Sequence, residues 1–402
     1  MPAMSITRRT LLAASASAPL AECSRSLDSI VIGAGVFGTW TAEHLRRVGR
    51  RVLLVDQMGP ANVRASSGGE SRMTRSAYGR DAVYTRMALD SLQEWKRLSE
   101  RASLPLFHPC GVLFFFEQVV DYARDSLGVH RELNLPLEEL DNAELTRRWP
   151  QLNFDGVSLG LFEPDFGALM ARRGVEETVA RFVAQGGEYR LARAEPAAGG
   201  HEVLLDGEAA HADAIVYACG PWLPKLFPEV LGERIFVTRQ EVAFIAPPDG
   251  DDSFEPHRLP GWADFNGGDL YYGFPNLEGR GFKIARDMHG APFDPDTGDR
   301  RMSEEGAALL RAFAERRFPA LAGRPFTEFR VCQYENSSNG DFLIDRHPTL
   351  EDVYLLGAGS GHGFKHGPEV GRMMAELVLA GTAPDPRFSL ASKGNVQART
   401  VL

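Results

Sequence analysis

The segment Ser29-Ile30-Val31-Ile32-Gly33-Ala34-Gly35-Val36-Phe37-Gly38 decides the fold of this chain. Its β-branched run predicts a buried strand that ends in the pattern Gly-x-Gly-x-x-Gly. The apolar spacing that follows predicts a helix up to Gly49. Residues 51–56 then form a second apolar run that ends in Asp56. Together these parts predict a β-α-β unit of the kind that binds dinucleotides.

The three glycines of this fingerprint each have a physical role. Gly33 permits a tight turn, Gly35 lets the backbone approach a pyrophosphate, and Gly38 lets the helix pack closely against the strand. Asp56 can accept a hydrogen bond from a ribose hydroxyl. An acid at this place disfavours a 2′-phosphate, so we expect FAD or NAD rather than NADP. A purely structural glycine turn is the alternative.

The composition is that of a globular protein of two to three domains. Its 402 residues are 44% hydrophobic and 24% charged, with a formal net charge of −10. No Lys/Arg cluster indicates a nucleic-acid surface, and no apolar run reaches the ~18 residues of a membrane span. The cysteine spacing fits neither zinc nor a disulfide scaffold, so we expect no metal site and read these side chains as buried and apolar: Cys23, Cys110, Cys219 and Cys332.

The N-terminal segment has the pattern of an export signal. Arg8-Arg9 precedes a short, weakly apolar run from Ala13 to Ala21, as in twin-arginine signals. That route carries folded, cofactor-loaded proteins. The pattern predicts a leader over residues 1–26 and a periplasmic location. The alternative is a disordered leader with a chance arginine pair on a cytoplasmic protein.

A second strand–glycine–helix pattern lies near the C-terminus. The apolar run 353–357 is followed by a glycine-rich loop up to Lys365 and by a helix over 368–379. Two such loops can converge on one large cofactor. The apolar run 214–219 ends at Gly220 and predicts another turn beside the dinucleotide, although a plain core strand fits the spacing equally well.

The middle of the chain predicts a second, sheet-based domain. Short strand patterns are frequent between residues 235 and 345. A short helix is expected over 142–148, with Asn142 as its N-terminal cap.

Four motifs together resemble the monomeric sarcosine oxidase family, the N-methyl amino acid oxidases, which are amine-oxidising flavoproteins of D-amino-acid-oxidase-like fold. The resemblance covers nearly the whole chain after residue 27. It rests on the fingerprint with Asp56, on residues 66–79, on 271–275 with 281–283, and on 332–334 with 341–348 and 360–365.

The resemblance implies an α/β fold with two domains. A discontinuous Rossmann-like FAD-binding domain would lie beside a mixed antiparallel-sheet substrate domain. The FAD-binding domain is expected over 27–107, 165–235 and 335–390. The substrate domain is expected over 108–164 and 236–334, with a tail over 391–402.

The resemblance also implies roles for single residues. FAD would be held covalently through its 8α-methyl carbon by the sulfur of Cys332. Arg75 and Lys365 would bind the substrate carboxylate, and Lys283 would lie beside the flavin where oxygen is reduced. The expected catalytic residues are therefore Lys283, Arg72 (under the flavin ring), Arg75, Lys365 and the pocket tyrosines Tyr272 and Tyr334.

The expected cofactor-binding residues lie in the two glycine loops, the Ser-rich loop after Asp56, the turn after residue 219 and the strand of Cys332. They are Gly33, Gly35, Val36, Phe37, Gly38, Asp56, Gln57, Ser66, Ser67, Ser71, Arg72, Gly220, Trp222, Cys332, Gly359, Gly361, His362, Gly363, Phe364 and Lys365. One position departs from the family. The family has a histidine four residues after the active-site lysine, and this chain has Asp287 there, which leaves the preferred amine open.

Each of these residues also has a plain structural interpretation. Arg72 and Arg75 fit a solvated face, although a guanidinium after a Ser/Gly loop can bind a carboxylate with two hydrogen bonds. Lys283 fits an edge strand, although a lysine among apolar residues is costly unless a partner holds it. Lys365 fits a surface charge, and Cys332 fits a core cysteine.

The resulting functional hypothesis is an FAD-dependent oxidase. A secondary or N-methyl amino acid would give a hydride equivalent from its C–N bond to the flavin, and water would hydrolyse the imine. Oxygen would then take the electrons and form hydrogen peroxide. A monomer is expected. Two alternatives remain: a dehydrogenase with another electron acceptor, and a flavin-binding module without turnover.

Overall fold

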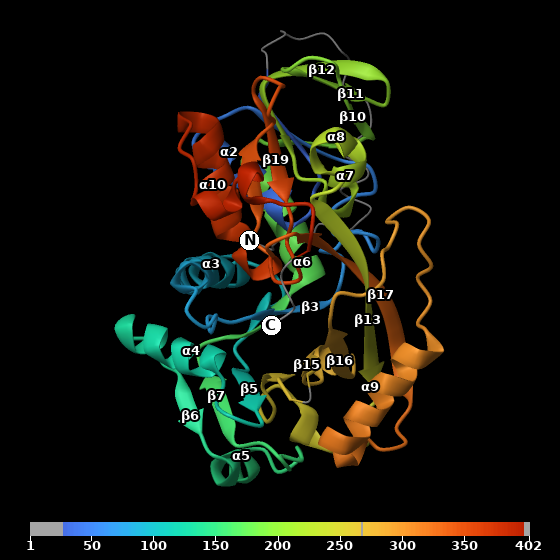
Figure 1. The fold of residues 1–402 in the computed structure, drawn as a ribbon. Coiled ribbons are helices and arrows are strands. Elements are labelled where there is room, and N and C mark those ends of the chain that lie inside the picture. Colours follow the sequence, from blue (N-terminus) through green and yellow to red (C-terminus); the bar gives the residue numbers. More distant parts are fainter. Residues whose placement is uncertain (1–26, 267, 398–402) are drawn as a thin grey trace.

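The structure is a computed structural model that describes residues 27–266 and 268–397. The expected leader over 1–26, with its arginine pair and Cys23, lies outside the described residues. The described chain forms two large sheets and a small third one (Figure 1). Within these ranges no helix is both long and apolar enough to cross a membrane.

The first large sheet is the parallel layer that the fingerprint predicts. β1 (Leu27–Ile32) pairs in parallel with β2 (Val52–Asp56) and β12 (Glu208–Tyr217), and β12 pairs in parallel with β19 (Val353–Gly357). The sheet therefore joins segments from both ends of the chain. Its other strands are β9 (Glu188–Leu191), β10 (Ala194–Pro196), β11 (Glu202–Leu205) and β18 (Leu343–Arg346).

The central strands β1, β2 and β19 of this sheet are buried on both faces. Successive residues of a strand point to opposite faces. Val31 and Leu54 therefore pack into one core, and Ile30 and Leu53 into another. A sheet covered on both sides has no polar face, which explains why these strands appear in the sequence as continuous apolar runs.

Helices α2 (Val36–Arg47) and α10 (Gly367–Ala380) pack beside this sheet and against each other (Figure 1). Their approach is close because Gly371 has no side chain: a Cβ atom there would lie 2.6 Å from the backbone of Trp40. Two further helices, α3 (Ala82–Ser99) and α6 (Ala171–Ala184), complete this layer.

The second large sheet is mixed, and its strand order is β17-β13-β16-β15-β14-β5-β7-β6. All neighbouring pairs are antiparallel except β14 with β5. Helix α9 (Glu304–Arg317) packs on it through Phe313, whose ring stacks 5.7 Å from that of Trp262. The strands are β5 (Val112–Phe116), β6 (Glu138–Leu140), β7 (Leu159–Glu163), β13 (Ile235–Ile245), β14 (Gly261–Asp264), β15 (Leu270–Phe274), β16 (Phe282–Asp287) and β17 (Phe326–Ser337).

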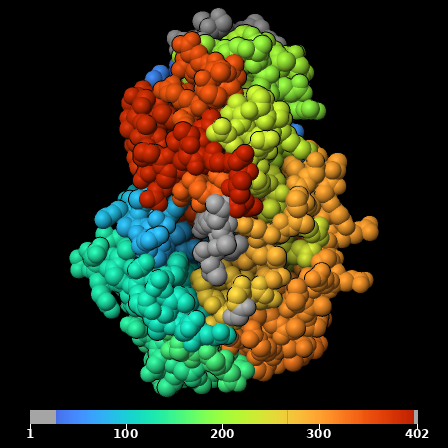
Figure 2. Space-filling view, viewed as in Figure 1, coloured from blue at the N-terminus to red at the C-terminus, as the bar shows by residue number. Residues whose placement is uncertain are grey.

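The two large sheets occupy different halves of the molecule. In the space-filling view the red and yellow-green segments of the first layer lie above the cyan, green and orange segments of the second (Figure 2). The structure thus confirms the α/β class with a second mixed sheet. The residue boundaries of the two domains stay a prediction.

The small third sheet was not predicted. It consists of β3 (Ser71–Thr74), β8 (Gly167–Met170) and β4 (Phe107–His108), and these strands are short and weakly patterned. It holds the residues around Arg72 in extended form.

One predicted helix cap is wrong. The helix α5 (Asn142–Arg148) is capped by Asp141, whose Oδ1 accepts a hydrogen bond from the Glu144 backbone at 2.8 Å. Asn142 is already helical, and its side chain instead donates to the carbonyls of Phe154 and Val157. The remaining helices are α4 (Asp121–Glu132), α7 (Leu223–Leu226) and α8 (Pro228–Leu231).

Candidate active site

A cavity of about 560 Å³ lies where the two large sheets meet. Its lining includes both glycine loops, the loop after Asp56, and inner residues of the second sheet. All residues expected to be catalytic or cofactor-binding line it, except Gly38 and Ser71. The fold therefore brings the sequence motifs to one place. Their individual roles stay predictions.

The first glycine loop has the geometry that a dinucleotide needs. Gly33 has φ +105°, a conformation that glycine adopts without strain, and Gly35 is the N-cap residue of α2. Gly38 does not line the cavity. A Cβ atom there would lie 1.9 Å from the Gly33 carbonyl oxygen, so its role is close packing of helix on strand. The start of α2 therefore lies at the cavity, where the positive end of the helix dipole favours a phosphate group.

Asp56 braces this loop. Its Oδ2 accepts a hydrogen bond from the Ala34 N–H at 2.9 Å, and its Oδ1 accepts from Met58 and Gly59. Burial raises the pKa of this carboxyl, and the three backbone N–H groups oppose that rise. The side chain lines the cavity beside Gln57, where a ribose hydroxyl can add a further bond.

The second glycine loop closes against the first. A Cβ atom at Gly363 would lie 2.8 Å from both the Phe37 ring and the Gly359 backbone. One at Gly361, where φ is +77°, would lie 2.9 Å from the ring of Tyr334. These absent side chains leave a cradle that an extended cofactor fits.

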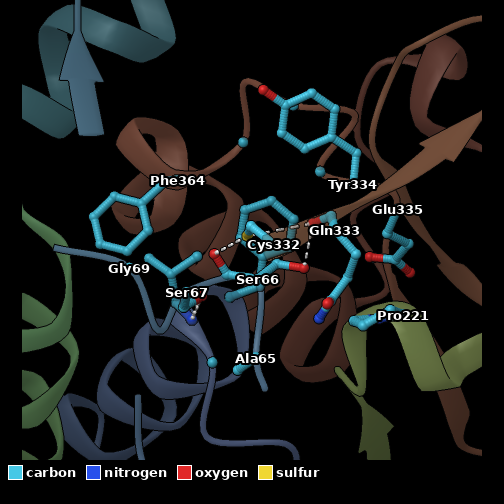
Figure 3. Close-up of a pocket in the computed structure, with 18 of the residues that line it drawn as sticks. Ala65, Ser66, Ser67, Gly69, Pro221, Cys332, Gln333, Tyr334, Glu335 and Phe364 are labelled. Carbon is cyan, nitrogen blue, oxygen red and sulfur yellow. Dashed lines mark hydrogen bonds between the residues drawn. The ribbon is translucent and has the colours of Figure 1, made fainter. Parts of the chain in front are cut away.

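Cys332 lies on β17 near the Ser-rich loop (Figure 3). Its Sγ is half-buried and lies 3.9 Å from the Ser66 carbonyl oxygen. Ser66 Oγ donates to the Gln333 carbonyl at 3.0 Å, which ties the loop to the strand (Figure 3). Ser67 Oγ accepts from the Val36 N–H at 3.1 Å and so ties the same loop to α2.

Lys283 is 4% exposed and extends from β16 toward the small sheet. Its Nζ donates to Ser71 O at 2.8 Å and to Ser71 Oγ at 3.3 Å, and it lies 5.0 Å from the Phe274 ring centroid. Burial, followed by the charge of Arg72, holds the pKa of Lys283 well below its usual value. Ser71 therefore holds this lysine rather than lining the cavity.

Arg72 links the Ser-rich loop to the small sheet. Its guanidinium donates to Ser71 O at 2.8 Å and to Ser66 O at 2.5 Å. It also lies 5.9 Å from the ring centroid of Phe364 in the second glycine loop. Its position is fixed by two carbonyls of its own segment and by one ring that is distant in sequence.

Arg75 and Lys365 converge on one side chain, Tyr78. Lys365 Nζ donates to the Tyr78 hydroxyl at 2.7 Å and to His362 O at 2.8 Å. The Arg75 guanidinium carbon lies 4.0 Å from the Tyr78 ring centroid. Two cations that line the same cavity and share a neighbour can bind one carboxylate.

The loop that carries Arg75 is held by a buried acid. Glu163 accepts from the Ser76 backbone at 2.6 Å and from Ala77 at 3.2 Å. Ser76 Oγ also lies 2.9 Å from His130 Nε2. No sequence pattern predicted this network, because its members lie on three separate segments.

Two tyrosines and Asp287 form another part of the wall. Burial and then the charge of Asp287 raise the pKa of Tyr272 to about 12 and hold that of Tyr334 well above its usual value. Both phenols therefore stay protonated at neutral pH. Asp287 lies at the end of β16 and also lines the cavity, at the position where the chain departs from the family.

Further lining residues were not predicted from the sequence. One group of them lies on or next to strands of the second sheet, whose inner face is set by strand register and not by any motif. They include Phe114, Gln240, Val242, Phe244, Ala263, Phe265 and Leu270. Glu335 was also missed, although it directly follows Tyr334 in a quoted motif. An acidic residue directly after that motif could have indicated a residue of the cofactor site.

Known proteins share both the sequence and the fold. A model of the FAD-dependent oxidoreductase family matches residues 28–377. The chain belongs to this family. It is 32% identical to monomeric sarcosine oxidase of Streptomyces avermitilis over 90% of this chain and 96% of the relative. It is 28% identical to N-methyl-L-tryptophan oxidase of Salmonella arizonae, with the same coverage. The predicted family is confirmed, and FAD with it.

Solved structures agree on the fold. The open form of NikD, described as an unusual amino acid oxidase, superposes with a TM-score of 0.76 at 23% identity and covers 91% of this chain and 98% of its own. The L-proline dehydrogenase of P. horikoshii superposes with a TM-score of 0.78 at 18% identity and covers 91% and 97%. These likenesses confirm the predicted fold class.

Proposed function

We propose that this protein is an FAD-dependent oxidase of the C–N bond of N-methyl or other secondary amino acids, that oxygen is its electron acceptor, and that it acts as a monomer. The observation that carries the proposal is that Arg75 and Lys365 both line the cavity with the two glycine loops and approach the same buried side chain, Tyr78. The printed names of the relatives, sarcosine oxidase and N-methyl-L-tryptophan oxidase, support the same substrate class.

The chain's own residues bind and orient the substrate. When bound, FAD supplies the two-electron acceptor. Arg75 and Lys365 would fix the carboxylate of the amino acid, which sets the position of its amine. The apolar wall of Phe114, Phe265 and Leu270 would exclude water and receive the substrate side chain.

Lys283 would assist the reaction with oxygen. Negative charge develops when oxygen accepts an electron, and a fixed cation or proton donor in a dry site stabilises it. Burial and Arg72 lower the pKa of Lys283, so its Nζ can release a proton more readily than an ordinary lysine. Ser71 holds that Nζ in place.

Covalent attachment of FAD at Cys332 is a further part of the proposal. The half-buried thiol lies beside the Ser-rich loop in the cavity, and its position in the motif supports a thioether to a flavin methyl carbon. Export through the twin-arginine pattern at Arg8-Arg9 is proposed on the sequence alone. Comparing periplasmic and cytoplasmic fractions of the native chain and of an Arg8→Lys, Arg9→Lys variant tests export.

The deciding experiment is a substrate panel with peroxide detection. Purified yellow protein is assayed in air with N-methyl, cyclic and primary amino acids, and with the matching amines that lack the carboxylate. The proposal expects peroxide from secondary amino acids and little from the amines. Anaerobic turnover with a dye, and no peroxide in air, would refute oxygen as the acceptor. No turnover of any amine would refute the whole assignment.

A further inference from the structure

Glu335 is a buried acid in the cofactor cavity. It follows Tyr334 on β17, is 6% exposed and lines the cavity near Pro221 (Figure 3). Among the described residues it forms no ion pair, unlike the other fully buried acid of the site, Glu163, which lies beside His130. Burying a carboxyl group without an ion-pair partner costs free energy, so another interaction must compensate for it.

The chain is shaped to hold this carboxyl. The backbone N–H groups of Ala358 and Gly359, just after the end of β19, face this carboxyl and lower its pKa against the effect of burial. A Cβ atom at Gly357 would lie 2.5 Å from Glu335 Oε1, so only glycine leaves the space. The backbone of Ser360 also donates to Glu335 O at 2.9 Å, which fixes the strand against the loop.

One oxygen of the carboxyl is left without a protein partner. Within 27–266 and 268–397, Glu335 Oε1 is buried and has no hydrogen bond. An unsatisfied buried polar atom costs free energy, and in native proteins a ligand or water commonly satisfies it. The side chain that carries this atom lines the cavity that the two glycine loops shape for a dinucleotide.

The protonation state decides what the free oxygen can do. Burial raises the pKa of Glu335 to about 8, and the two backbone N–H groups only partly oppose it. The neighbouring Cys219 thiol interacts with both Glu335 and Asp56, and each of these groups adds negative charge when it ionises. Lys225 and Asp296 also line the cavity, and they form an ion pair with each other. The carboxyl therefore keeps its proton at neutral pH, and a protonated carboxyl is a hydrogen-bond donor.

We propose that Glu335 is an FAD-binding residue whose protonated carboxyl donates a hydrogen bond to an oxygen of the ribityl–pyrophosphate linker of FAD. Its place supports the linker as the acceptor, because Glu335 follows Cys332 on β17 and interacts with Cys219, whose backbone lies beside Gly33. An ionised carboxylate would repel the pyrophosphate, whereas a neutral one binds it. This inference depends on FAD and not on which amine is oxidised.

The test measures FAD binding in a Cys332→Ser background, in which FAD stays exchangeable. Apoprotein is titrated with FAD, and quenching of flavin fluorescence gives the Kd. Glu335→Gln keeps a donor of nearly the same shape and should change the Kd less than about threefold. Glu335→Met removes the donor and leaves a linker oxygen unsatisfied, so the Kd should rise about tenfold or more.

Thermal unfolding of the same apoproteins separates binding from folding. Glu335→Met removes an unsatisfied buried oxygen, so its apoprotein should melt no lower than the parent while binding FAD more weakly. A structural role would lower both. The inference is overturned if the Met variant binds FAD as tightly as the parent, or if it loses FAD only together with its fold.

A second measurement covers a Met variant that does not fold. The Kd for FAD of the parent should rise above about pH 8, as Glu335 ionises, and that of Glu335→Gln should not share this rise. Cys219 and Asp56 are present in both proteins, so their ionisation contributes equally to the pH dependence of the two Kd values. Equal pH dependence of the two proteins would overturn the inference.

Discussion

Removal of the Tyr78 hydroxyl should weaken the carboxylate site without disturbing FAD. This hydroxyl is the acceptor for Lys365 Nζ at 2.7 Å and lies 2.8 Å from His366 Nε2. Burial, followed by the charge of Lys365, holds the pKa of His366 well below its usual value, so the imidazole is neutral and can accept the phenolic proton. Tyr78→Phe removes the hydroxyl but keeps the ring on which Arg75 lies.

The expected size of the effect follows from these contacts. Lys365 would keep its bond to the His362 carbonyl at 2.8 Å and would lose the buried, charge-assisted bond to the Tyr78 hydroxyl. Such a bond contributes about 1.5–3 kcal/mol. If the carboxylate site depends on the placement of Lys365, the Kd for a carboxylate should rise by roughly 10- to 150-fold.

The assay is a titration of FAD-loaded protein with acetate, followed by the flavin absorption spectrum. Tyr84→Phe is the matched control. Tyr84 is also buried and stacks on Tyr78, but its hydroxyl donates to Asp341 at 2.6 Å, away from the two cations. Acetate affinity should fall in Tyr78→Phe and hold in Tyr84→Phe. Equal acetate affinity in Tyr78→Phe and the parent would refute the reasoning.

Three further outcomes are expected. Cys332→Ser should release its flavin into the supernatant on acid denaturation, whereas the parent pellet stays yellow; free flavin from the parent would exclude the thioether. Lys283→Met should slow flavin reoxidation by oxygen by about two decades or more in stopped flow, with little change in anaerobic reduction by substrate; unchanged oxygen reactivity would make Lys283 structural. In the apoprotein, burial raises the pKa of Glu335 from 4.5 in the unfolded chain to about 8 in the folded chain. Between these two pH values only the folded state holds the proton, so the free energy of unfolding falls as the pH rises from about 4.5 to about 8. The free energy of unfolding should fall by at most about 5 kcal/mol in the parent and should not show this fall in Glu335→Gln. Urea unfolding of the two proteins at several pH values measures it, and the same pH dependence in both would contradict the prediction.

The sequence predicted those parts of the molecule that local patterns determine. The run from Ser29 to Gly38 specifies strand, turn and helix within one short segment, and the structure has them as β1 and α2. The C-terminal glycine loop was predicted for the same reason. Family motifs then located Arg75, Lys283 and Lys365, which the fold brings to one cavity.

The sequence could not predict features that depend on long-range packing. The small sheet pairs Ser71–Thr74 with Gly167–Met170, and neither segment has a strong strand pattern alone. The sharing of Tyr78 by two cations depends on segments almost 300 residues apart. The place of Glu335 Oε1 depends on Gly357, because a side chain at that glycine would occupy the same space. The sequence does not show that these two residues meet.

The first sheet has a consequence for the order of events during synthesis. β1 is among the first described segments to leave the ribosome, but its sheet neighbours include β12, and β19 joins that sheet only after residue 353. The loop that faces Gly33 across the cavity, Gly359 to Gly363, follows β19. Until then the nascent chain has an open helix start and unpaired strand edges, which favour aggregation. Cofactor insertion therefore belongs to the last stage of maturation, and a chain truncated before α10 should neither acquire flavin nor stay soluble.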